Sequence, residues 1–167
     1  MYSASVPVFR NMLGNLGHLL DKAQAHAEAR KFDPAVLVED RLAPDMLPLR
    51  KQVQIACDGA KNGLARLSGV EAPKFEDTET TFAALKERIR MTLEFLDSVP
   101  RRHVDGCEDK DITFPVGREA TRTLKGEAYL LNWALPNLFF HITTAYAILR
   151  HNGVELGKSE YLLGARA

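Results

Sequence analysis

Apolar side chains recur at three- and four-residue spacing in four stretches of the chain, with polar side chains between them. This period places the apolar residues on one face of a helix, so each stretch predicts a long amphipathic helix. The expected helices span about Ser5 to Ala29, Asp45 to Leu67, Glu79 to Ser98 and Pro136 to Asn152. Because each helix must bury its apolar face, the pattern predicts an all-α, four-helix bundle.

Polar residues, prolines and glycines mark the expected ends of these helices. The predicted N-caps are Ser5, Asp45 and either Asp77 or Thr78, and the predicted stops are Gly69, Pro100 and Gly153. Pro7 is expected in the first turn of the first helix, and Asp33 followed by Pro34 predicts a short extra helical turn. Gly126–Trp133 is expected to form one more helical turn, and Pro136 to start or kink the last helix.

Residues 100–133 do not keep the helical period. Asp111–Val116 and Thr121–Leu124 are short β-like runs on either side of Gly117, which predicts a small hairpin inserted between the third and fourth helices. Pro115 has no N–H to donate, so its strand is expected to be short or to lie at an edge.

The direction of the third helix is not fixed by the length of the link before it. The second helix would be ~32 Å long at the usual helical rise. The 11 residues from Ser68 to Thr78 can span at most ~36 Å. The link can therefore return along the bundle, making the two helices parallel, or form a slack antiparallel turn. In either case we expect one domain over residues 1–167.

The composition is that of an ordinary globular protein, with 46% hydrophobic and 26% charged residues. Lys plus Arg and Asp plus Glu both number 22, so no net field favours nucleic acid or an anionic membrane as a partner. The first residues lack the apolar run of a signal peptide. Cys57 and Cys107 lie in different contexts and are expected to be free thiols, so a cytoplasmic location is expected.

The last predicted helix carries the main candidate residue, His141. Asn137 lies one turn before it, and Ala145 stands where a His-x-x-x-His metal motif would place its second histidine. Asp45 and Gln52 border the apolar stripe of the second helix and could face His141. Two interpretations stay open: a buried histidine whose hydrogen bond fixes the register of the helices, or a pocket histidine able to act as a general base.

Aromatic residues are concentrated in the C-terminal third of the chain: Tyr129, Trp133, Phe139, Phe140 and Tyr146. Packing in the core and in a homodimer interface is one use of such residues, and lining a pocket is the other. The candidate pocket residues are therefore His141, Asn137, Asp45, Gln52, Trp133 and Tyr129. Asp58 and Lys61 are expected to form an ion pair within the second helix.

Three segments resemble the signature of a bacterial domain family of unknown function in the DinB/YfiT-like superfamily of proposed metalloenzymes. They are Asp45–Lys61, Leu135–Val154 and Leu156–Lys158. The resemblance implies an up-down-down-up bundle and pairing as a homodimer. It also implies a divalent metal such as nickel or zinc, held by one histidine on the second helix and a His-x-x-x-His pair on the last, and in some members a small thiol as co-substrate.

Only one of these metal-binding positions carries over to this chain. His141 matches the first histidine of the pair, but Ala145 replaces the second, and no histidine lies between His26 and His103. We therefore expect no bound metal or other cofactor, with His141 as the one candidate ligand. The expected function is a binding or interaction protein with a degenerate metal site. The alternative is a metal-dependent transferase or hydrolase, thiol-dependent in one form, that uses His141 as ligand or general base.

Overall fold

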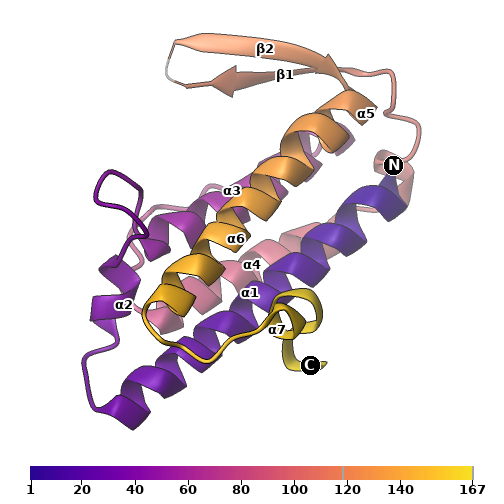
Figure 1. Ribbon diagram of the computed structural model, residues 1–167. Helices are drawn as coiled ribbons and strands as arrows, with labels where there is room; N and C mark the ends of the chain where they lie inside the picture. The colour runs from indigo at the N-terminus through magenta and orange to yellow at the C-terminus, as the bar shows by residue number, and fades with distance from the viewer. Residues whose placement is uncertain (118, 167) are drawn as a thin grey trace.

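Four long helices pack side by side in the computed structural model, which describes residues 1–117 and 119–166 (Figure 1). They are α1 (Tyr2–Arg30), α3 (Leu49–Ser68), α4 (Phe82–Ser98) and α6 (Leu135–His151). The shorter elements are α2 (Ala35–Glu39), a 3-10 turn (Arg101–His103), α5 (Gly126–Tyr129), a π-helical turn (Leu130–Ala134), α7 (Lys158–Leu163) and a last 3-10 turn (Gly164–Arg166).

Helices α3 and α4 run parallel, and α1 and α6 run in the opposite direction (Figure 1). The link between α3 and α4 returns along α3, because Lys61 Nζ donates to the carbonyl oxygen of Pro73 at 2.7 Å and Lys51 Nζ binds Asp77 at 2.8 Å. The architecture is therefore the up-down-down-up four-helix bundle. Of the two paths that the length of the link allowed, the chain takes the returning one.

The apolar stripes of the four helices form one core. Its members include Phe9, Leu13, Leu16 and Leu20 of α1, Val53, Ala56 and Leu64 of α3, Leu85 and Leu96 of α4, and Leu138, Ile142 and Ala145 of α6. The left-handed backbone at Gly69 (φ 79°) and Gly153 (φ 81°) follows the ends of α3 and α6, where the sequence predicts the stops.

The predicted start of the first helix was wrong. The helix begins at Tyr2, so Ser5 is not its cap and Pro7 lies inside it. Ser5 is buried and donates its hydroxyl back to the carbonyl oxygen of Met1 at 3.0 Å. The N–H of Tyr2 instead donates to the carboxylate of Asp105 at 2.8 Å. A residue distant in sequence thus satisfies one of the orphan amides at the true start of the helix.

The predicted caps of the next two helices were also wrong. Helix α3 follows Pro48, and Asp45 lies exposed in the preceding segment. Helix α4 begins at Phe82, and the hydroxyl of Thr81 accepts from the N–H of Ala84 at 3.2 Å. Residues 77–79 lie outside the helix, and the carboxylates of Asp77 and Glu79 bind cations of α3 and α4.

Helices α5 and α6 form one continuous helical path through the π-helical turn. Pro136 lies in the first turn of α6. A proline cannot donate to the carbonyl four residues earlier and its ring crowds that carbonyl, so an α-helix interior does not accept it without distortion. The wider π-helical turn just before Pro136 accommodates this conflict. The sequence predicts that Pro136 starts or kinks the last helix, and in the structure the irregularity is this turn.

A two-stranded antiparallel hairpin, β1 (Asp111–Val116) and β2 (Ala120–Lys125), lies across the end of the bundle where α5 begins (Figure 1). The sequence predicts this hairpin, and β2 is one residue longer at each end than expected. Ile112 and Phe114 are buried beneath it, which ties the hairpin to the bundle.

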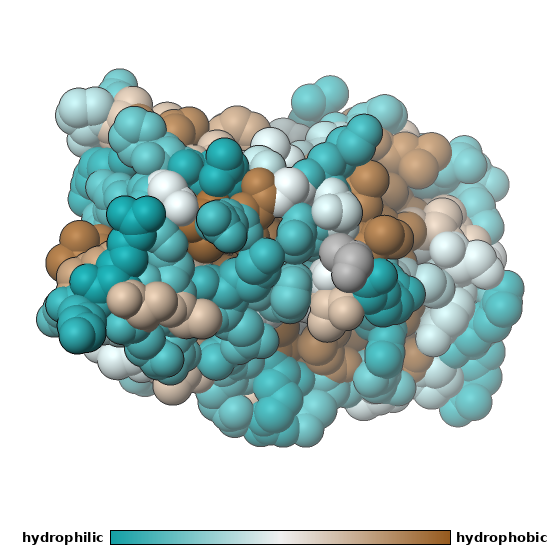
Figure 2. Space-filling model, turned by 60° about the horizontal axis from the view of Figure 1, so that its bottom comes forward, coloured by the Kyte–Doolittle hydropathy of each residue, from teal (hydrophilic) through white to brown (hydrophobic). Residues whose placement is uncertain are grey.

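The surface is mainly hydrophilic where Figure 2 shows it, with hydrophobic residues gathered in separate patches. Among the residues that the structure describes, no helix combines the length and the apolar character needed to cross a membrane.

Candidate functional site

A groove between α3 and the α5–α6 path is the place where three of the six predicted pocket residues meet. Three polar side chains come from α3, namely Asp58, Asn62 and Arg66, and Tyr129, Trp133 and Asn137 come from the opposite wall. Ile55, Gly59 and Ala134 complete the lining. We call this the α3–α6 groove; its volume is about 220 Å³.

The hairpin sets the aromatic wall of the α3–α6 groove. The buried ring of Phe114 on β1 lies 4.9 Å, centroid to centroid, from the ring of Tyr129 and 4.9 Å from that of Trp133. Such tilted aromatic pairs add stability beyond the area they bury. Phe114 therefore fixes the orientation of both rings, and the hairpin acts as a support for the groove.

Arg66 and Tyr129 make a polar pair at one end of the α3–α6 groove. A guanidinium N–H of Arg66 donates to the hydroxyl of Tyr129 at 3.0 Å, and Tyr129 is only 1% exposed. Within residues 1–117 and 119–166, Arg66 forms no salt bridge. Its positive charge is thus held next to a buried hydroxyl without a carboxylate partner.

Asp58 belongs to a second polar group behind the α3–α6 groove. The expected ion pair with Lys61 is present at 3.2 Å, and Asp58 also lies 3.1 Å from the guanidinium of Arg88. Arg88 is fully buried and binds Glu79 at 2.9 Å and Asp77 at 3.0 Å. Burial raises the pKa of Glu79, but the hydrogen bonds from Arg88, from Gln54 and from a backbone N–H, together with the charge of Arg88, outweigh it. The resulting pKa lies below the ordinary value.

His141 lies about one turn beyond Asn137 on α6 and pairs with Gln52 of α3. Its Nδ1 is 2.8 Å from Gln52 Oε1, while Gln52 Nε2 donates to the carbonyl oxygen of Leu47 at 2.9 Å. Because the amide N–H₂ is used in that bond, Oε1 accepts and Nδ1 of His141 donates. The neutral ring therefore keeps its lone pair on Nε2. Burial lowers the pKa of His141 below the ordinary 6.5 and favours this neutral form.

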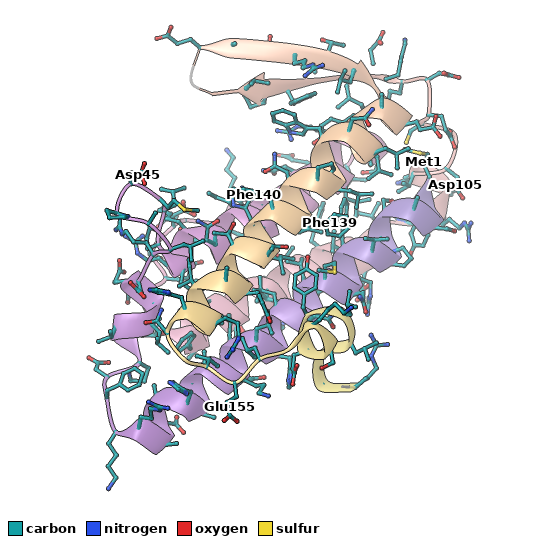
Figure 3. The ribbon with its side chains drawn as sticks, viewed as in Figure 1. Met1, Asp45, Asp105, Phe139, Phe140 and Glu155 are labelled. Carbon is teal, nitrogen blue, oxygen red and sulfur yellow. The ribbon has the colours of Figure 1, made fainter. Side chains whose placement is uncertain are left out.

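The six predicted pocket residues fall into three places. Tyr129, Trp133 and Asn137 line the α3–α6 groove, and Gln52 binds His141 one turn away. Asp45 does neither: it is exposed on the segment before α3, and Figure 3 shows its side chain at the tip of that segment.

The contribution of α3 to the groove was not predicted from the sequence. Asp58, Asn62 and Arg66 are spaced four residues apart, which places them on one face of a helix. That spacing was the available signal. Whether this face meets Trp133 and Asn137 depends on how α3 and α6 pack, which the spacing does not specify.

The side chains around His141 do not fit a transition metal. Such ions take three or four nitrogen, sulfur or oxygen ligands. The second position of the motif is the buried methyl group of Ala145, and α3 offers the amide of Gln52. In the described part of the chain, no group of three or more His, Cys, Asp or Glu side chains could hold a metal ion.

Replacing His141 with alanine is expected to cost roughly 1–3 kcal/mol of unfolding free energy, because Gln52, only 2% exposed, loses the donor to its Oε1. His141→Gln keeps a donor and an acceptor and should recover part of the loss. Urea unfolding at pH 7.5 measures both variants. An alanine variant as stable as the parent would contradict the structural role and favour a site role.

The same variants give a second readout through pH. The folded pKa of His141 lies below its unfolded value, so the histidine contributes stability above about pH 6.5 that is lost as pH falls through the folded pKa. His141→Gln should therefore reduce the slope of stability against pH just below 6.5. An unchanged slope would show that another group titrates there.

Comparison with known proteins finds a matching family and similar solved structures. Over residues 1–162 the sequence matches a domain of unknown function, DUF1993. The fold is similar to the crystal structure of a DinB family member protein from Shewanella denitrificans, with a TM-score of 0.88 and 47% sequence identity over 96% of this chain and 90% of that chain. No curated protein matches the sequence.

Proposed function

The chain belongs to the DUF1993 family of DinB-like bundle proteins, and from that premise we propose that it is a small-molecule-binding protein without a catalytic metal. Its binding site is the α3–α6 groove. The observation that carries this proposal is a contrast between two places on the same pair of helices. Around His141 the ligand set is incomplete, whereas one turn away aromatic, amide and cationic side chains converge on one concavity.

The convergence in the groove has features that a binding site needs. Trp133 and Tyr129 supply flat apolar surface, and Asn62 and Asn137 supply amides that both donate and accept. Phe114 packs against the two aromatic rings from behind, so they do not have to be ordered when a ligand arrives. Such preorganisation reduces the entropy cost of binding.

A second candidate function is an enzyme with His141 as general base. It is favoured by the lone pair on Nε2, which makes no hydrogen bond to a described residue, and by the lowered pKa that keeps the ring neutral. Gln52 would hold the ring in the required tautomer. This function needs a substrate proton within reach of Nε2, so a reaction abolished in His141→Gln with binding intact would support it.

Metal content separates the proposal from a metal-dependent activity. Protein purified without chelators is expected to hold nickel, zinc and iron far below one equivalent, since His141 alone does not complete a coordination shell. Plasma mass spectrometry measures this. Near-stoichiometric metal in the parent that is absent from His141→Ala would overturn the metal-free proposal.

The proposal includes a homodimer formed through α6. Phe139 (37% exposed) and Phe140 (59%) lie on the surface of α6, as Figure 3 shows, and Leu131 (49%) is exposed in the π-helical turn just before it. Buried aromatics dominate the energy of such interfaces.

We expect Phe140→Asp to convert the dimer to a monomer of 18.6 kDa in light scattering at micromolar concentration. Val36→Asp, at an equally exposed site on α2, is the control and should stay dimeric. A parent protein that already has the monomer mass would contradict the dimer.

A further inference from the structure

We propose that the α3–α6 groove binds a small organic carboxylate with a flat body, the carboxylate on Arg66 and Tyr129 and the body against Trp133. This inference rests on the proposed function and adds the chemical class of the ligand. It follows from the charge at one end of the groove, the free donors there, and the shape and size of the rest.

The donors at the Arg66 end have unused capacity. One guanidinium N–H is spent on the hydroxyl of Tyr129, which leaves further N–H groups in a planar fork suited to a carboxylate. The Tyr129 oxygen accepts that bond, and within the described residues no acceptor receives its own proton. Tyr129 lines the groove although it is largely buried, so a ligand oxygen bound in the groove would accept this proton.

The charge of Arg66 is not cancelled by the carboxylate nearest to it in the lining. Asp58 is already paired with Lys61 and Arg88. The whole group behind the groove balances, with three carboxylates and three cations: Asp58, Asp77, Glu79, Lys51, Lys61 and Arg88. Lys110 adds a further cation close by, since its Nζ donates to the backbone carbonyl oxygen of Arg66 at 3.0 Å. The Arg66 end is therefore positive and favours an anion.

Arg66 also lies in the last turn of α3, where the helix dipole favours a cation. That role explains the charge but requires neither the hydroxyl of Tyr129 nor the ring of Trp133. The two explanations differ in one outcome: only a binding role makes Arg66 affect the affinity for an anion.

The rest of the groove limits the shape and the size of the ligand body. Trp133 provides a flat face, and Ile55 and Ala134 add apolar contact. The volume of the groove, about 220 Å³, limits the ligand to a small molecule. A single-ring acid has this size, and Asn62 and Asn137 can bind a polar substituent on the ring. Benzoate is the simplest probe of this class.

Trp133 is the single tryptophan of the chain, so its fluorescence reports on the groove alone. We expect benzoate to give a saturable change in the dimer at pH 7.5. The neutral isostere benzamide should bind about tenfold more weakly, since it lacks a charge-assisted bond to Arg66, and benzylamine should not bind.

Arg66→Gln should weaken the binding of benzoate about tenfold and leave the binding of benzamide unchanged. The affinity of Arg66→Lys for benzoate should lie between those of the parent and the Gln variant. Tyr129→Phe should weaken the binding of benzoate by a smaller factor. Arg90→Gln, an exposed arginine of α4, is the matched control and should bind as the parent does. Circular dichroism melts confirm that each variant is folded.

Two results would overturn the carboxylate proposal but leave binding in the groove intact. One is equal binding of benzoate, benzamide and benzylamine to the parent, and the other is equal binding of benzoate to the parent and the Arg66 variants. If none of the three compounds changes the fluorescence, the carboxylate proposal fails, and a fragment screen by NMR that also finds no groove ligand would remove the proposed function.

Discussion

Arg88→Met is expected to destabilise the protein by about 3 kcal/mol, at the lower end of the range for breaking a buried ion pair. Arg88 is fully buried, and its guanidinium holds Glu79 and Asp77 as well as the carbonyl oxygen of Glu76. Methionine fills much of the same volume but leaves Glu79, which is itself only 10% exposed, without its cation. Asp77 keeps Lys51, which moderates the loss.

Urea unfolding of the parent and the variant measures this effect. Arg90→Met is the control, because Arg90 pairs with Glu87 and Glu94 on the solvent side of the same helix. Exposed pairs contribute at most about 1 kcal/mol. Equal losses in the two variants would mean that the Arg88 cluster does not hold the fold together.

The stability of the protein at acid pH is expected to depend on the same cluster. The pKa values of Asp77 and Glu79 are lowered in the folded state, so both carboxylates contribute stability above about pH 4.5 that is lost as pH falls through their folded values. Arg88→Met removes the main cause of this lowering for Glu79. Its stability should therefore fall less steeply with acid than that of the parent.

Gly126→Ala is expected to cost about 3 kcal/mol, the upper end of the usual cost of overpacking. A Cβ at this position would overlap the backbone carbonyl oxygen of Cys107 and lie 3.0 Å from its carbonyl carbon. Backbone cannot rotate away as a side chain can, and the segment is held by a bond from the N–H of Glu127 to the carbonyl oxygen of Glu108 at 3.0 Å. Either α5 or the loop before β1 must move.

The matched control is Gly17→Ala, in the middle of α1, where an added Cβ would meet no atom within 4 Å. It should stabilise by about 0.5–1 kcal/mol, since alanine loses less backbone entropy in a helix than glycine. Thermal melts of both variants provide the comparison. A Gly126→Ala protein as stable as the parent would show that the approach to Cys107 relaxes without cost. Because α5 carries Tyr129, the same variant should also disturb the α3–α6 groove.

The candidate site was predictable in part. Tyr129, Trp133 and Asn137 are among the pocket residues that the sequence predicts, and the structure brings these three to one groove. It also ranks Asp45 with Gln52 as partners of His141, but Asp45 lies before α3 begins and only Gln52 reaches the ring. Arg66 was missed because a cation near the end of a helix has an adequate local explanation.

The sequence by itself determined the helices, the hairpin and the family, because each rests on local information. Apolar spacing fixes which face of a helix is buried, Gly69 and Gly153 mark helix ends through a backbone conformation that glycine favours, and Pro115 marks an edge strand. These signals act over a few residues and need no knowledge of the partner.

Only the tertiary structure decided where α1, α3 and α4 begin and what faces His141, and it confirmed the direction of α4 that the family resemblance implies but that local signals leave open. Each depends on contacts between residues far apart in the chain, such as Tyr2 with Asp105 and Asp58 with Arg88. A capping hydroxyl and a distant carboxylate satisfy a helix amide equally well, and an 11-residue link reaches either end of α3. Local chemistry leaves these alternatives close in energy, and burial of Arg88 with its carboxylates selects the returning link.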